Sequence, residues 1–241
     1  MKKLHLLLLL ALSMIMFSCG DEEPDYRIKH DPVDLGLSVK WAPMNIGAIA
    51  PEAMGGLYGW GDSTGHHKPI ESEYPVAISF NMVNGHEITN VDWRSPYFGG
   101  KTPLANISGT EYDASVYMWS NQWRMPTHEE WLELIDFCTW TPIADMEGAT
   151  GTVFRVTGPN GNSIIIPLGG IDTSNASEAR GTEGHYWTSS LLPISDQAEY
   201  YYQSIVPCAA WSVKITRQGN ITTEPQVRCF SLSIRPVYAK Y

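Results

Sequence analysis

The chain has 241 residues, of which 43% are hydrophobic and 11% aromatic, and a formal net charge of −10 at pH 7. This length supports one sizeable hydrophobic core, and the 21 glycines and 16 prolines are scattered, which favours a turn-rich domain of short strands over a helical bundle. An acidic balance without any basic cluster argues against nucleic acid as a partner and against electrostatic attachment to anionic lipid.

Residues 1–18 have the pattern of a secretory signal peptide. Lys2 and Lys3 precede an apolar run from Leu4 to Phe17, which is shorter than the roughly 20 residues that a transmembrane helix needs. The stretch Met16–Cys19 resembles the lipobox of bacterial lipoproteins, and this resemblance implies cleavage before Cys19 and lipid on its sulfur. The alternative is an ordinary signal peptide followed by an incidental cysteine.

Residues 19–32 are predicted to form a polar, acidic linker between the lipid and the folded domain. Gly20–Glu23 resembles the acidic tract that directs lipoproteins of the Bacteroides group to the outside of the outer membrane. A solvated, disordered tether is a second interpretation, compatible with the first. We expect an exported lipoprotein that is exposed on the cell surface and attached to the outer membrane through the lipid on Cys19.

Residues 33–241 contain no internal repeat and no second linker, so a single domain is expected. Leu37–Ala42 alternates between apolar and polar residues and is predicted to be a strand. Gly55–Gly61, in which glycines separate aromatic residues, predicts a short strand with another backbone close by. Residues 62 to about 118 show little periodicity and are interpreted as long surface loops.

One helix is predicted at about 126–139. Thr127 and Glu130 form a capping box at its start, and apolar residues then recur at helical spacing from Trp131 to Cys138. A hairpin should follow, with an Asn-Gly turn between its two strands. One helix among many short strands predicts an α+β fold, mostly antiparallel; the strands expected after the helix are Val153–Thr157, Ser163–Pro167, Tyr186–Ser189, Tyr200–Ile205, Trp211–Thr216 and Arg228–Val237.

Three cysteines remain if Cys19 carries lipid, and an odd number leaves at least one thiol unpaired. Cys208 and Cys229 both lie in strand-like segments and could form a disulfide across a sheet. The sequence does not fix the geometry that this bond requires, and the pairing of Cys138 is equally open.

A series of motifs resembles the Fibrobacter succinogenes major paralogous domain family over about residues 33–238. The most specific block is Trp123–Trp131, and the others, in the order of the family, are Asp34–Ala42, Asn45–Ala48, Tyr58–Gly61, Tyr112–Ala114, Asn162–Pro167, Tyr186–Ser189 and Ser233–Val237. The resemblance implies a fold like that of C-type lectins and formylglycine-generating enzymes. It implies no particular activity. The motif residues are expected to be framework, with Arg124 and Arg235 paired to buried carboxylates or carbonyls.

No pattern of catalytic or cofactor-binding residues stands out. The chain lacks a Gly-x-Ser-x-Gly elbow, a phosphate-binding loop and the close cysteine pair of formylglycine-generating enzymes. His66 and His67 are adjacent, whereas zinc sites prefer wider spacings. The sequence therefore predicts no metal, no cofactor and no enzymatic activity, with an unrecognised or formylglycine-generating-like enzyme as a remote alternative.

Aromatic residues in the predicted loops are the remaining candidates for binding. Exposed aromatic rings among Asn, Asp and Gly can stack on sugar rings, while for each single residue a place in a loop-covered core is the favoured alternative. The first hypothesis is a surface module that binds a glycan or a protein, and the second is a structural component of the cell surface or of an appendage. The candidate ligand-binding residues are Trp60, Trp93, Tyr97, Tyr112 and Trp119.

Overall fold

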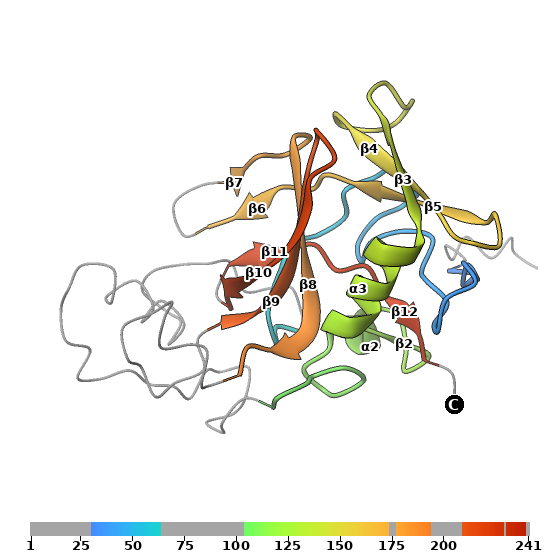
Figure 1. The fold of residues 1–241 in the computed structure, drawn as a ribbon. Coiled ribbons are helices and arrows are strands. Elements are labelled where there is room, and N and C mark those ends of the chain that lie inside the picture. Colours follow the sequence, from blue (N-terminus) through green and yellow to red (C-terminus); the bar gives the residue numbers. More distant parts are fainter. Residues whose placement is uncertain (1–29, 64–103, 174–176, 194–208, 229, 240–241) are drawn as a thin grey trace, which may run out of the picture.

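A three-stranded antiparallel sheet with one helix on its face organises the domain (Figure 1). The computed structural model describes residues 30–63, 104–173, 177–193, 209–228 and 230–239. The strands of this sheet, in spatial order, are β10 (Ile221–Val227), β9 (Ala209–Thr216) and β8 (Glu183–Leu191). The predicted strands at 186–189 and 211–216 lie inside β8 and β9 and are confirmed.

The helix α3 (His128–Phe137) packs against β8 and β9. Thr127 is its N-cap, and both hydrogen bonds of the predicted capping box are present. Trp131 and Leu134 are fully buried on its inner face, because residues three apart on a helix share one side. The predicted helix is therefore confirmed, apart from its outermost residues.

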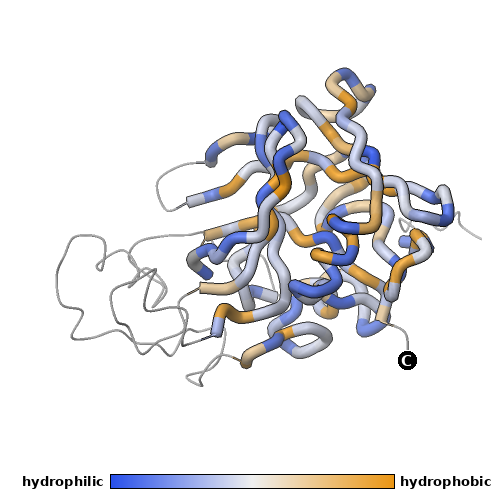
Figure 2. Tube along the Cα trace, viewed as in Figure 1, coloured by the Kyte–Doolittle hydropathy of each residue, from blue (hydrophilic) through white to orange (hydrophobic). Residues whose placement is uncertain are grey.

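A second antiparallel sheet consists of β3 (Thr139–Ile143), β4 (Val153–Thr157) and β5 (Ser163–Pro167). The predicted β4–β5 hairpin is confirmed to the residue, with Thr157 opposite Ser163 beside the loop. Gly161 adopts φ 85° in that loop, a conformation that glycine accepts without steric cost. Hydrophilic residues lie at the tips of the β4–β5 and β9–β10 hairpins (Figure 2).

Two smaller sheets and a five-residue helix complete the fold. One sheet has the strand order β1 (Tyr58–Gly59), β11 (Ser231–Leu232), β6 (Ile171–Asp172) and β7 (Ser177–Glu178); the other pairs β12 (Val237–Tyr238) with β2 (Trp123–Arg124), and the helix is α2 (Ala114–Met118). All strand pairs described are antiparallel, while isolated parallel bridges such as Tyr186–Ser233 connect the sheets. The α+β class with mostly antiparallel short strands is confirmed.

Two clusters of buried side chains form the core. The first lies between α3 and the sheets and includes Trp41, Trp131 and Tyr186. The second surrounds Trp60 and Trp187. These two indoles make reciprocal buried hydrogen bonds: Trp60 Nε1 donates to the Thr188 carbonyl at 2.8 Å, and Trp187 Nε1 donates to the Tyr58 carbonyl at 2.7 Å. The aromatic motifs of the sequence therefore join β1 to β8.

Three predictions about secondary structure need correction. Leu37–Ala42 is not a strand: residues 36–39 form a bend, and only Trp41 pairs, in isolated bridges with Val33 and Val237. Arg228–Val237 is not one strand: β11 and β12 are separate strands, and residues 234–236 between them belong to no strand. Residues 114–118, expected in a loop, form α2 because Asp113 caps them and accepts from the Ser115 amide. The strand predicted at 200–205 lies outside the described residues.

The cysteine and membrane features are only partly covered by the structure. Cys138 is a free thiol at the C-terminal end of α3, where burial raises its pKa to about 11. Cys19, Cys208 and Cys229 lie outside the described residues, as does the expected signal peptide. Within the described ranges, no helix is long and apolar enough to cross a membrane.

Candidate functional site

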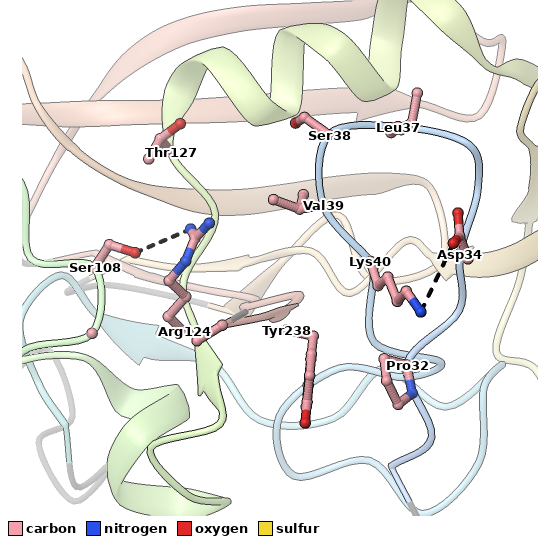
Figure 3. A pocket seen from close by; sticks show the side chains of 12 residues that line it. Pro32, Asp34, Leu37, Ser38, Val39, Lys40, Ser108, Arg124, Thr127 and Tyr238 are labelled. Atoms are coloured by element: carbon pink, nitrogen blue, oxygen red, sulfur yellow. Dashed lines mark hydrogen bonds and ion pairs between the residues drawn. The ribbon is translucent and has the colours of Figure 1, made fainter. Parts of the chain in front are cut away.

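A cavity beside the start of α3, here called the Lys40 pocket, is the candidate site (Figure 3). Its volume is about 810 Å³, within the range of roughly 300–1,000 Å³ typical of small-molecule sites. Three stretches of chain that are far apart in sequence form its walls. The lining residues are Pro32, Asp34, Leu37, Ser38, Val39, Lys40, Ser108, Gly109, Arg124, Thr127, Tyr238 and Ala239.

The first wall is the bent segment 32–40, which hydrogen bonds hold at both ends. Val33 and Trp41 exchange two backbone hydrogen bonds of 2.8 and 2.9 Å. In the middle of the bend, the amide of Ser38 donates to Glu133 Oε1 at 2.9 Å, and the Ser38 hydroxyl donates to the same carboxylate. A segment without strand pairing is thereby fixed to α3, and it presents Lys40 to the cavity.

The opposite wall is built around Arg124 of β2. Its guanidinium donates to both oxygens of Glu130, at 2.8 and 2.5 Å, and to the Ser108 hydroxyl at 3.2 Å. Glu130 also accepts from the Thr127 amide at 2.8 Å as part of the capping box. Such bidentate pairs fix both partners in orientation. Arg124 therefore shapes the wall while most of its donors are used within the protein.

Tyr238 of β12 provides the aromatic surface of the pocket. Its amide donates to the Lys40 carbonyl at 2.8 Å, and its ring meets the Trp123 ring edge-on at a centroid distance of 5.4 Å. The side chain is half-buried. In Figure 3 it lies between Arg124 on one side and the Lys40–Asp34 pair on the other.

Lys40 and Asp34 are the charged pair with spare hydrogen-bonding capacity. Lys40 Nζ lies 3.8 Å from Asp34 Oδ2, and the two side chains are 50% and 52% exposed. This distance exceeds that of a hydrogen bond, and exposed ion pairs of this kind contribute little to stability. The pair therefore offers a donor and an acceptor, a few ångströms apart, to a ligand in the cavity.

The lining combines charged, hydroxyl and aromatic groups. Among the described residues that line it, there is no histidine and no cysteine, and Asp34 is the one acidic residue. Across the described part of the chain, no group of three or more His, Cys, Asp and Glu side chains is arranged to hold a metal ion. The arrangement provides two charged groups, several hydroxyls and one aromatic ring, which can orient a polar ligand.

The sequence-predicted aromatic residues do not line the Lys40 pocket. Trp60 is fully buried, so the prediction that its ring is a surface for stacking is wrong: its indole belongs to the second core cluster. Tyr112 and Trp119 are partly buried and pack against the same cluster. Trp93 and Tyr97 lie outside the described residues. The structure thus brings Tyr112 and Trp119 to the region around α2, away from the lining.

The pocket residues that sequence reasoning missed are Asp34, Lys40 and Tyr238. Each stands in or beside one of the sequence motifs, near one of the two ends of the domain, but these charged and aromatic residues have no spacing that indicates a site. The bridge between Trp41 and Val237 and the hydrogen bond from the Tyr238 amide to the Lys40 carbonyl bring these ends together in the fold.

No protein-family model, curated protein or solved structure matches this chain.

Proposed function

We propose that this protein is a surface-anchored, non-enzymatic lipoprotein of the major paralogous domain family, with a C-type-lectin-like domain that binds a glycan in the Lys40 pocket. The observation that carries the glycan assignment is the separated Lys40–Asp34 pair, 3.8 Å apart and half exposed, beside the Tyr238 ring. The motifs and the lipobox support the family and the anchor.

A sugar hydroxyl has the properties that this pair requires. A hydroxyl both donates and accepts, so one hydroxyl can accept from the Lys40 ammonium and donate to the Asp34 carboxylate, and neighbouring hydroxyls can engage each group separately. Hydrogen bonds to charged groups contribute about 1.5–3 kcal/mol each. The C–H face of a sugar ring can then cover Tyr238.

Three features favour a glycan over a charged metabolite. The lining pairs its cations with carboxylates, so it carries no strong excess of either charge. Its Ser and Thr residues and its backbone at Gly109 offer further polar contacts. The volume of about 810 Å³ accommodates more than one sugar ring.

The test is binding of the full chain, kept in detergent micelles, to a broad glycan panel. We expect saturable binding that falls by roughly tenfold or more in Asp34→Asn and in Lys40→Met, because each loses a charged hydrogen bond. Asp145→Asn, an exposed acid in the β3–β4 turn, is the matched control and should bind normally. No binding across the panel, or equal binding by Asp34→Asn and Asp145→Asn, contradicts the proposal.

The anchor has its own test. In a Gram-negative host, the full chain should incorporate labelled palmitate, and Cys19→Ala should not. Protease added to intact cells should digest the wild-type chain if it faces outward. Equal labelling of both chains would refute the lipid on Cys19 without affecting the glycan assignment.

A further inference from the structure

The surface around α2 exposes large apolar side chains. Tyr117 is 63% exposed and Met118 is 42% exposed, and Trp119, the C-cap of the helix, is half-buried beside them. These residues, together with His30, which contacts Trp119, are here called the α2 patch. Tyrosine and tryptophan side chains combine an apolar ring with a polar tip, which suits a boundary between water and an apolar phase.

The segment that carries Tyr117, Met118 and Trp119 is poor in charge, and exposed acidic residues stand only at the edges of the α2 patch, at Asp31 and Glu111. Between residues 112 and 123, Asp113 is the one Asp, Glu, Lys or Arg, and it is fully buried. Its carboxylate accepts from the amides of Gly109, Ser115 and Met125 at 2.7–2.8 Å. The surface of this segment therefore carries no side-chain charge that would oppose contact with a membrane.

The segment that leads to the expected anchor joins the domain at this patch. The His30 ring stacks on Trp119 with centroids 3.6 Å apart and an interplanar angle of 11°. Cys19 precedes His30 by eleven residues, and a chain of that length spans at most about 40 Å. A lipid on Cys19 would thus keep the patch within that distance of the membrane.

A series of aromatic contacts connects the patch to the Lys40 pocket. Trp119 meets Trp123 edge-on at 5.2 Å, and Trp123 meets Tyr238 edge-on at 5.4 Å. Trp123 is buried, with 5% of its surface exposed, so these rings form one packed unit. The patch therefore has a rigid base.

We propose that the α2 patch rests in the interfacial layer of the membrane to which the chain is anchored, with Tyr117, Met118 and Trp119 at the level of the lipid headgroups. This assignment rests on the proposed lipid on Cys19. Because the tether keeps the patch close to the bilayer, a weak contact is enough.

The experiment uses the lipidated full chain, labelled with 5-fluorotryptophan, on phosphatidylcholine vesicles that contain a headgroup spin-labelled phospholipid. The Trp119 resonance is assigned from Trp119→Phe. We expect strong broadening of Trp119 and little broadening of Trp211, a partly buried indole on β9. The double variant Tyr117→Ser/Met118→Ser should lose the difference. Phe137→Ser, another large apolar side chain that is 68% exposed, should retain it.

The other outcomes separate the two proposals. Vesicle-bound chain in which Trp119 and Trp211 broaden equally overturns the α2 assignment and leaves the anchor in place. Wild-type chain that binds vesicles no better than Cys19→Ala removes the anchor, and the α2 assignment with it. A dimer in micelles that Tyr117→Ser/Met118→Ser dissociates would assign the patch to a second copy of the chain and overturn its membrane role.

Discussion

Arg235 is a buried cation whose partners are all neutral acceptors. Its Nε donates to Asn45 Oδ1 at 2.8 Å, and its two terminal nitrogens donate to the carbonyls of Ala42 and Ile165 at 3.0 and 2.6 Å. Burial lowers the pKa of Arg235 to about 10, so it stays charged at neutral pH. The predicted framework role is confirmed, because these bonds join the N-terminal segment to β5.

Removing this guanidinium should be one of the most damaging substitutions in the domain. Arg235→Met leaves two buried acceptors and one partly buried acceptor without this donor, and we expect the free energy of unfolding to fall by about 3–5 kcal/mol. Arg155→Met on β4, where the side chain is exposed, should change it by less than about 0.5 kcal/mol. Urea denaturation followed by tryptophan fluorescence measures both. Similar losses in the two variants would refute the framework role of Arg235.

Trp60 has a different role from the predicted one, because its ring is fully buried in the core. Trp60→Phe keeps the apolar ring but removes the hydrogen bond to the Thr188 carbonyl, so the free energy of unfolding should fall by about 1–3 kcal/mol. Glycan affinity should stay the same, because Trp60 does not line the Lys40 pocket. Loss of affinity in a variant that remains folded would return Trp60 to the list of ligand-binding residues.

Among the elements, α3 depends on Glu130 more than on its neighbour. Both Glu129 and Glu130 lie in the first turn, but Glu130 alone completes the capping box and pairs with Arg124. Glu130→Ala should therefore lower the free energy of unfolding by about 2–3 kcal/mol. Glu129→Ala, which alters an exposed residue, should cost less than about 0.5 kcal/mol. Thermal or urea unfolding of the two variants measures both losses, and equal losses would contradict the prediction.

The elements that the sequence predicted correctly are those with local signals. The capping box fixes α3, and the Asn-Gly loop fixes the β4–β5 hairpin, because both act within a few residues. Leu37–Ala42 alternates like a strand, but its partner is the side chain of Glu133. In Arg228–Val237, two short pairings replace one long strand: β11 with β1 and β6, and β12 with β2. Such pairings depend on tertiary contacts that no local pattern encodes.

At the scale of the whole molecule, the candidate site exists only after folding. Asp34 and Lys40 come from the start of the described chain, Tyr238 from its end, and Arg124 from the middle. No cluster or regular spacing of residues surrounds them in the sequence, so composition and spacing could not identify them as site residues. The aromatic residues of the predicted loops were easier to single out in the sequence, but aromatic rings occur both in cores and on surfaces. Trp60 lies in the core.

The pH dependence of stability is also a property of the whole molecule. Burial lowers the pKa of His30, His128 and His185 below their ordinary value of 6.5. For His185, burial prevails even though Glu183 accepts from its ring. The unfolded chain therefore binds more protons than the folded chain just below pH 6.5. Stability from these groups is fully present above pH 6.5, and it is lost as the pH falls from 6.5 through the lowered pKa values of the folded chain.

We therefore expect a lower urea midpoint at pH 5.5 than at pH 7.5. An opposing effect exists, because protonation reduces the net charge of −10 and its self-repulsion. At 0.15 M salt that repulsion is screened beyond about 8 Å, so the local cost of charging buried imidazoles should prevail. His185→Gln removes one such group, and the difference between its two midpoints should be smaller than that of the wild-type chain. A midpoint that rises on acidification, or an unchanged difference in His185→Gln, would show that the net charge and not the buried histidines governs stability in this range.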